Sequence, residues 1–229
     1  MKKPGVLVFF VKTPEYSAVK TRLAAGIGAY NAQVFYYLSI SALEQLAIEV
    51  KRHMPGLTTM WAVAEKEAVT AKIWANMPVI WQGAGTLGDR FGFVYERLIE
   101  KYKFVCFMGP DSPHISSRKI LTAIEETAHN FESRFVLGPT IEGGFYFYGG
   151  SLQLKEKVFE MVNYSRSATV DSLKSYLESA APVKIINLDF DIDTVEDLSR
   201  YVNLKDEEQL LKSQINLIEW VRQLTGSHD

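Results

Sequence analysis

Apolar runs of strand length alternate along this chain with longer amphipathic segments. The first run, 6–11, has no polar face, which is typical of a strand buried on both sides. The later runs predict strands at 58–64, 79–81, 104–108, 135–137, 145–148 and 183–188. Apolar residues spaced by three or four predict helices at 30–52, 66–76, 86–101, 116–130, 152–161, 168–179 and 206–224. Residues 12–28 predict a long polar loop.

Strands that alternate with helices imply an α/β fold with a mostly parallel central sheet and helices on both faces. No linker-like or low-complexity stretch interrupts residues 1–204, which we interpret as a single domain. The segment 205–229 is expected to be a C-terminal amphipathic helix that packs on this domain. A contact between two copies in a homodimer is the alternative for its apolar stripe.

The composition of the 229 residues, 47% of them hydrophobic, suits one large domain with a full core or two small ones. The net charge is −2 and both signs are spread along the chain, so no basic tract indicates nucleic acid or a membrane surface. The one cysteine excludes a disulfide within the chain and a cysteine zinc site. No segment approaches the roughly 20 apolar residues that span a bilayer, so we expect a cytoplasmic protein.

One acidic residue stands directly beyond a predicted buried strand. The run 104–108 ends at Gly109 and Pro110, and Asp111 follows before the next predicted helix. In open α/β sheets, ligands bind in the crevice beyond the carboxyl ends of the strands. Asp111 is therefore a candidate for catalysis or metal binding, although an aspartate before a helix is also an ordinary helix cap.

Basic residues occupy the loop after the first predicted strand. Lys12 and the sequence Lys20-Thr21-Arg22 place cations where such folds hold phosphates. Lysine supplies a compact charge, and arginine supplies a planar fork that binds phosphate with two hydrogen bonds. The simpler interpretation is a solvated basic loop.

Two segments with glycines are further candidates. Leu87 and Gly88 either let a flat ligand approach the backbone or only form the turn into a helix. Glu142, Gly143 and Gly144 either line a ligand or form a β-turn with an exposed acid.

A second acidic segment follows the last predicted strand. Asp191 and Asp193 are candidates for a divalent-metal site together with Asp111, because Mg²⁺ binds through carboxylate and phosphate oxygens. Thr194 and Asp197 instead predict the capped start of a short helix.

The order of these segments resembles the glycosyltransferase-A (GT-A) superfamily, the Rossmann-like fold of nucleotide-diphospho-sugar transferases. Within it, the chain is similar to a family of uncharacterised bacterial proteins. In that family K-x-P-x-x-G-x-x-K-T-R-L is followed by G-x-L-G-x-R, G-S-D-C-P, G-P-x-x-D-G-G-Y and D-x-D-T-x-x-D-L. The matching segments are 12–23, 85–90, 109–113, 138–145 and 191–198. Guanylyltransferases of phospholactate and of the molybdenum cofactor are more distantly similar.

The resemblance implies a GT-A domain that binds a nucleotide with a divalent cation, Mg²⁺ or Mn²⁺. Lys20, Arg22 and Asp111 would be its catalytic residues. By their place in the motifs, the candidates divide into metal ligands (Asp111 with Asp191 or Asp193), phosphate-side residues (Lys12, Lys20, Thr21 and Arg22), nucleobase-side residues (Leu87 and Gly88) and acceptor-side residues (Glu142, Gly143 and Gly144).

These observations predict a transferase that moves a nucleotidyl or a glycosyl group from a nucleoside triphosphate or nucleotide-sugar to a small-molecule acceptor. The Lys-Thr-Arg-Leu loop favours nucleotidyl transfer. The absence of the glycine signature of sugar-nucleotide pyrophosphorylases from 12–23 favours glycosyl transfer. A non-catalytic nucleotide-binding or scaffolding protein is the alternative, because fold does not determine function and Tyr16, Ser17 and Glu142 depart from the family pattern.

Overall fold

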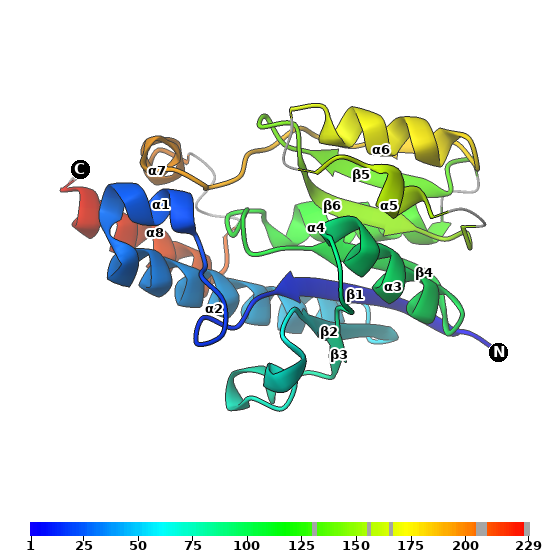
Figure 1. The fold of residues 1–229 in the computed structure, drawn as a ribbon, viewed down its shortest axis with the longest axis horizontal. Helices are drawn as coiled ribbons and strands as arrows, with labels where there is room; N and C mark the ends of the chain where they lie inside the picture. The colour runs from blue at the N-terminus through cyan, green and yellow to red at the C-terminus, as the bar shows by residue number, and fades with distance from the viewer. Residues whose placement is uncertain (130–131, 155–156, 165–166, 205–209, 227–229) are drawn as a thin grey trace.

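The computed structural model describes residues 1–129, 132–154, 157–164, 167–204 and 210–226 of the chain. Its centre is a seven-stranded sheet with the strand order β3-β2-β1-β4-β6-β5-β7 (Figure 1). The strands are β1 (Lys3–Val11), β2 (Leu57–Val63), β3 (Val79–Trp81), β4 (Tyr102–Met108), β5 (Phe135–Pro139), β6 (Phe145–Gly150) and β7 (Val183–Ile185). Only β6 runs antiparallel to its neighbours β4 and β5. The predicted α/β fold with a mostly parallel sheet is thus confirmed.

Helices cover both faces of the sheet because the side chains of each strand alternate between the faces. Leu7, Phe9 and Val11 of β1 pack with α2 (Ala29–His53) and α4 (Ser117–His129). Val6 and Val8 pack on the other face with α3 (Leu87–Ile99), α5 (Val158–Met161) and α6 (Thr169–Glu178). The unbroken apolar run of β1 therefore follows from burial on two sides.

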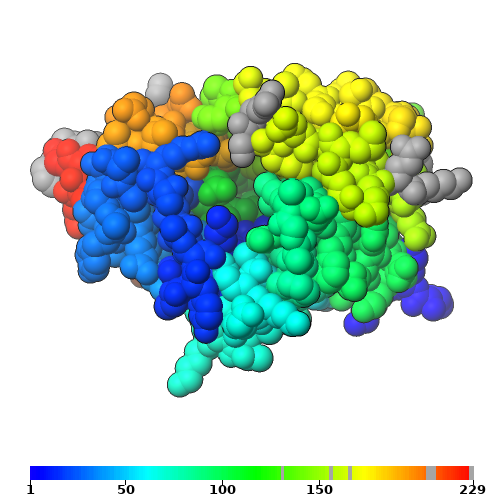
Figure 2. Space-filling model, viewed as in Figure 1, coloured from blue at the N-terminus to red at the C-terminus, as the bar shows by residue number. Residues whose placement is uncertain are grey.

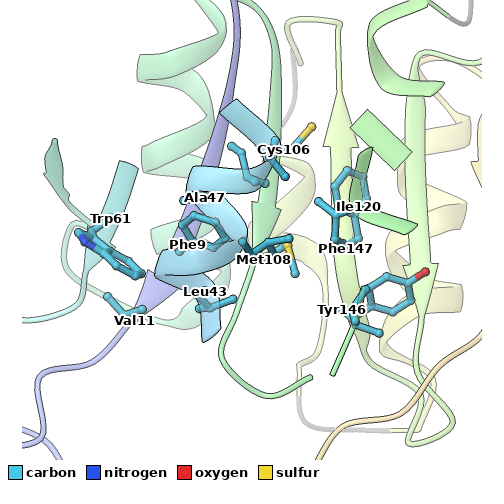
Figure 3. Packing of buried hydrophobic residues seen from close by; sticks show 14 of the residues in the cluster. Phe9, Val11, Leu43, Ala47, Trp61, Cys106, Met108, Ile120, Tyr146 and Phe147 are labelled. Atoms are coloured by element: carbon cyan, nitrogen blue, oxygen red, sulfur yellow. The ribbon is translucent and has the colours of Figure 1, made fainter. Parts of the chain in front are cut away.

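The core under α2 holds the carboxyl ends of β1 and β4 in register. Figure 3 shows Phe9 of β1 and Met108 of β4 beside Leu43 and Ala47 of α2. Phe9 also contacts Trp61 of β2, with 5.4 Å between the ring centroids. Phe9 pairs with Met108, the last residue of β4, so β1 continues two residues further, to Val11, and both strands end at the same edge of the sheet.

A third core lies beyond the end of the sheet, where helices α1 (Thr21–Ile27), α7 (Val195–Val202) and α8 (Lys212–Thr225) come together (Figure 1). It buries Leu23, Phe35, Leu198 and Leu217. Among the described residues, α8 therefore packs on α2 and α7 of its own chain. The predicted start of this helix, 206–209, lies outside the described residues, and residues 210–211 precede it.

The prediction of a loop over 12–28 is wrong in its second half, because Thr21–Ile27 is helical. Isolated helices of this length are not stable in water, so α1 depends on tertiary contacts rather than on its own propensity. Leu23 is fully buried, and Gly26 lets Val195 of α7 approach closely enough to overlap with an added Cβ.

Three other predicted elements differ from the structure. The helix predicted over 66–76 is two 3-10 turns, Lys66–Ala68 and Lys72–Trp74, because the buried Ala68 and Trp74 fall on successive turns rather than on one helical face. The predicted helix 152–161 reduces to α5, with 155–156 outside the described residues. The strand predicted over 183–188 ends at Ile185.

Asn130, the predicted end of α4, also lies outside the described residues. Among the described helices, none is both long and apolar enough to cross a membrane.

Candidate active site

A cleft of about 720 Å³ opens at the carboxyl ends of β1 and β4. Figure 2 shows it as a hollow between the blue N-terminal segment with α1, the green helix α3 and the yellow segment that contains α5 and α6. Its volume is typical of sites for small ligands, and its position is where ligands bind in open α/β sheets. Most of the residues predicted to form a site line this cleft, from segments as far apart as 10–22 and 191–193.

Asp111 lies where β4 leaves the sheet. The strand is buried up to Met108, and the chain then turns at Gly109 and Pro110 into the cleft. The carbonyl oxygen of Asp111 accepts a hydrogen bond from the backbone N–H of Ile192 at 2.8 Å, which ties the loop after β4 to the late acidic segment. The carboxylate remains 54% exposed.

Lys20, in the loop before α1, contacts both the loop after β4 and the late acidic segment. Its Nζ lies 2.6 Å from Asp111 Oδ1, donates to the carbonyl oxygen of Ile192 at 2.6 Å and lies 3.4 Å from Asp193 Oδ1. Burial acts to lower the pKa of Lys20, but the charges of Asp111 and Asp193 outweigh it, and the pKa is raised. The buried ammonium is therefore charged.

The two aspartates of the late acidic segment differ in their partners. Asp191 accepts hydrogen bonds from neutral hydroxyls, Ser112 Oγ at 2.6 Å and Thr140 Oγ1 at 3.2 Å. Burial and the nearby charge of Asp111 raise the pKa of Asp191 to about 7. Asp193 instead lies between Lys20 and Arg22, whose Nη1 is 3.4 Å from Asp193 Oδ2. Of the two carboxylates, that of Asp191 therefore has fewer cationic partners among the described residues than that of Asp193.

The acceptor-side loop follows β5. The carboxylate of Glu142 accepts from the backbone N–H of Asp191 at 3.1 Å and lies 3.6 Å from Arg200. Gly143 has φ +87, and a Cβ there would overlap with the carbonyl oxygen of Ser167. Glu142 and Gly144 line the cleft, whereas Gly143 is a turn residue behind it.

The remaining candidates fall into two groups. Lys12 and Thr21 line the cleft, and the Tyr36 hydroxyl fixes the backbone of Lys12 by bonds to its N–H and its carbonyl oxygen. Leu87 lines the cleft and is 44% exposed. Gly88 faces the other way, against the backbone of Phe159, so the structure does not bring it to the other candidates.

The predicted cap at Thr194 is confirmed. Thr194 and Asp197 form a capping box at the start of α7, and Asp197 also accepts from the N–H of Asp193 at 3.0 Å. Thr86 and Asp89 form a second capping box at the start of α3. These caps set where Asp193 and Leu87 stand.

Sequence reasoning missed a buried network beneath the acids. His114 Nε2 lies 2.7 Å from Asp189 Oδ1, and Lys119 Nζ lies 2.8 Å from Asp189 Oδ2. Burial acts to raise the pKa of Asp189, but its bonds to His114 and Lys119 outweigh this and lower it, while burial lowers the pKa of His114. Asp189 is therefore ionised and His114 neutral, with its Nε2–H as the donor.

The signal for this network was its spacing. His114 lies three residues after Asp111, and Asp189 lies two before Asp191. Ser112 and Thr140 are also buried where each holds Asp191. In the part of the chain that the structure describes, no three acidic, histidine or cysteine side chains converge as a ready metal cage. Asp111, Asp191 and Asp193 all line the cleft, and carboxylate oxygens are the ligands that a hard cation prefers.

A family of proteins matches residues 49–166, just over half of the chain, and is described as uncharacterized proteins conserved in bacteria (DUF2064). The chain belongs to this family. The matched segment contains three of the five motifs on which the resemblance rests, those at 85–90, 109–113 and 138–145. No curated protein matches the sequence.

Several solved structures share this fold. A protein of Desulfovibrio desulfuricans G20, described as a "putative nucleotide-diphospho-sugar transferase", has a TM-score of 0.81 at 20% identity, over 100% of this chain and 99% of its own. A cytidylyltransferase from Leptospira borgpetersenii has a TM-score of 0.54 at 14% identity, over 99% and 96% of the two chains. A CMP:2-keto-3-deoxy-manno-octonic acid synthetase complexed with CTP has a TM-score of 0.54 at 12% identity, over 86% and 96%. The predicted GT-A fold is thus confirmed for this member of the family.

Proposed function

We propose that this protein is a divalent-metal-dependent transferase that acts on the phosphates of a nucleotide, and that it transfers the nucleotidyl group of a nucleoside triphosphate to a small acceptor. The observation that carries the proposal is the meeting of Lys20 and Arg22 with Asp111, Asp191 and Asp193 in one cleft. Cations for phosphate and carboxylates for a metal are the two components that such transfer needs. The fold shared with the CTP-bound synthetase supports it.

The residues present fit a hard cation. Lys20 Nζ already sits among three oxygens, those of Asp111, Ile192 and Asp193, so this position stabilises positive charge. We assign Asp111 and Asp191 as the protein ligands of Mg²⁺ or Mn²⁺. Two carboxylates suffice, because Mg²⁺ completes its sphere with phosphate oxygens and water. When bound, the metal neutralises charge on the phosphates.

The side chains would act by binding and orientation. Lys20 and Arg22 hold the phosphates and stabilise the negative charge that develops on the leaving pyrophosphate. A hydroxyl or phosphate oxygen of the acceptor forms the new bond to the α-phosphorus while the bond from this phosphorus to the bridging oxygen breaks. We assign Leu87 to the nucleobase side and Glu142 with Gly144 to the acceptor side. In support of this assignment, all three line the cleft.

Glycosyl transfer is the second candidate. It is favoured by the absence of any glycine from residues 12–23, where sugar-nucleotide pyrophosphorylases carry their glycine signature. Here the acceptor oxygen attacks the anomeric carbon of a nucleotide-sugar, and a nucleoside diphosphate leaves. Released pyrophosphate identifies the first reaction, and released nucleoside diphosphate identifies the second.

The test is a thermal-shift panel of nucleoside triphosphates and nucleotide-sugars with Mg²⁺ or with EDTA, followed by product analysis. A ligand at 100 times its dissociation constant adds about 2.7 kcal/mol to the free energy of unfolding. We expect a shift that depends on Mg²⁺ and disappears in Asp111→Asn, while Asp171→Asn, the same change at an exposed position of α6, retains it. An unshifted panel, or binding without product, refutes the proposed transferase.

A further inference from the structure

The ammonium of Lys20 is held as a bound cation would be. Its three oxygen partners come from two segments, the loop after β4 (the Asp111 carboxylate) and the late acidic segment (the Ile192 carbonyl and the Asp193 carboxylate). The side chain is only 3% exposed, whereas that of Arg22, two residues further on, is 68% exposed. A phosphate in the cleft can therefore meet Arg22 directly, but it meets Lys20 only if Lys20 leaves its oxygen cage.

The backbone at Lys20 is strained. Its φ of 48° makes it the one residue other than glycine with positive φ among the described residues. Side chains with a Cβ avoid this conformation unless the surrounding contacts over-determine it. Lys20 stands immediately before α1, so its flexible four-carbon side chain can turn about its own bonds without unfolding the helix.

We propose that Lys20 is the resident counter-ion of the site: in the ligand-free protein its ammonium takes the place beside Asp111 that a divalent metal takes in the active complex, and metal enters together with a nucleotide whose phosphates accept the displaced ammonium. This inference rests on the proposed function for the site and adds the order of its assembly. Two cations on one Asp111 carboxylate repel each other strongly in a partly buried place. An ammonium that moves onto phosphate remains paired while it vacates the carboxylate.

The exchange has a thermodynamic signature. Metal alone must compete with an ammonium that belongs to the same chain, so its affinity for the wild-type protein is low. A phosphate that draws the Lys20 ammonium away from Asp111 removes the cation that competes with metal. A metal bound to Asp111 in turn occupies the carboxylate that retains the Lys20 ammonium. Metal and phosphate therefore each raise the affinity of the other by the same factor.

The experiment compares Lys20→Gln with the wild type and with Arg22→Gln. Gln at position 20 removes the charge and keeps an N–H donor for the Ile192 carbonyl oxygen. Arg22→Gln removes one charge from the exposed side of Asp193 and leaves the cage intact. Mg²⁺ alone is titrated by calorimetry and Mn²⁺ alone by electron paramagnetic resonance. Each titration is repeated with inorganic tripolyphosphate, which has no base.

We expect Lys20→Gln to bind metal alone at least about tenfold more tightly than the wild type, a gain of about 1.4 kcal/mol. Arg22→Gln should change this affinity by less than about threefold. Tripolyphosphate should raise metal affinity more in the wild type than in Lys20→Gln. Equal or weaker binding of metal alone by Lys20→Gln overturns the inference. If Lys20→Gln is unfolded in EDTA, Mg²⁺ should restore its circular dichroism, and failure to do so also overturns it.

The failure of this inference differs from that of the proposed function. If Lys20 is a permanent structural cation, Mg²⁺ leaves the affinity of the wild type for tripolyphosphate unchanged, and the exchange is refuted. If the wild type binds no nucleotide at all with Mg²⁺, the proposed function fails, whatever the metal-only titrations of Lys20→Gln show.

Discussion

Replacement of His114 by Phe tests whether the buried network beneath the acids supports the site. The imidazole is 3% exposed and stacks on Phe190 with 4.0 Å between the ring centroids. Phe at position 114 retains a ring for this stack and removes the donor to Asp189. The carboxylate of Asp189 keeps its bonds to Lys119 and to the N–H of Phe190. The substitution therefore isolates the loss of one hydrogen bond to a charged, mostly buried acceptor.

The expected cost follows from the state of that acceptor. Loss of a donor to a buried charged group costs about 1–3 kcal/mol in the free energy of unfolding. The lower half of this energy range applies here, because Asp189 retains two partners and is ionised beside Lys119. His114 Nδ1 has no partner among the described residues, so its removal returns part of the cost. We expect His114→Phe to lose about 1–2 kcal/mol at pH 8.

The loss should depend on pH with a definite sign. Burial lowers the pKa of His114 in the folded protein, and its contacts with Asp189 only partly oppose this. Below pH of about 6.5 the unfolded chain takes up a proton at this histidine that the folded protein does not. The wild type therefore loses stability as the pH falls, and His114→Phe lacks this loss. The difference between the two should shrink from pH 8 to pH 5.

Urea unfolding at pH 8 and pH 5 measures the difference. His53→Phe is the control, since His53 lies at the exposed end of α2 and the same exchange there should change stability by less than about 0.5 kcal/mol. The network also ties the Asp111 loop to the Asp191 segment, so His114→Phe should weaken nucleotide binding with Mg²⁺. A difference that grows toward pH 5 refutes the protonation argument. Unchanged stability together with unchanged nucleotide binding refutes the supporting role.

Three further changes have expected outcomes. Asp191→Asn should stabilise the metal-free protein at pH 8 but not at pH 4, because burial and Asp111 raise the Asp191 pKa to about 7 and the folded state resists ionisation of this carboxyl. The same variant should lose the stabilisation by Mg²⁺ with nucleotide, and denaturant unfolding measures both effects. Gly143→Ala should lose more than about 1 kcal/mol, because its φ is positive and a Cβ overlaps with the carbonyl oxygen of Ser167, whereas Gly92→Ala, where a Cβ meets nothing, should lose none. Leu217→Ala should lose about 2–5 kcal/mol in the same assay, because its side chain is fully buried on the inner face of α8.

The sheet was predictable because its strands are apolar runs bounded by polar or turn-forming residues. In β1 every residue from Val6 to Val11 is buried, and a run this short, rich in β-branched and aromatic residues, favours a strand at the centre of a sheet over a buried helix. The position of Asp111 followed from the same pattern, since the chain must leave the sheet where the apolar run ends. Secondary structure set by burial alone is therefore readable from the sequence.

Elements that depend on distant partners were not predictable in this way. Helix α1 exists because Leu23 and Gly26 fit against α2 and α7, and nothing within residues 21–27 indicates those partners. Gly88 is a glycine because Phe159, about seventy residues later, lies against its backbone. The motif that contains it left two interpretations open, a ligand near the backbone or the turn into a helix, and the structure shows that the close approach at Gly88 is made by the chain itself.

The chemistry of the site was predictable as a set of residue types, and its electrostatics were not. Asp191 and Asp193 have the same side chain two residues apart, yet only Asp193 contacts Lys20 and Arg22. This difference arises from the direction of Lys20, which depends on a positive φ that no lysine pattern indicates. The sequence therefore left the two aspartates equivalent as metal ligands, and the structure distinguishes their surroundings.

The supports of the site extend to the end of the described chain. Gln214 of α8 is 1% exposed, and its Nε2 donates to the carbonyl oxygens of Pro113 at 2.7 Å and Ile115 at 2.9 Å, on either side of His114. A buried carbonyl without a donor costs free energy, so the loop after Asp111 keeps this path only while α8 is docked. The docking of α8 depends in turn on Leu217 and its neighbours. The C-terminal helix, outside the five motifs of the family resemblance, is therefore part of what holds Asp111 in place.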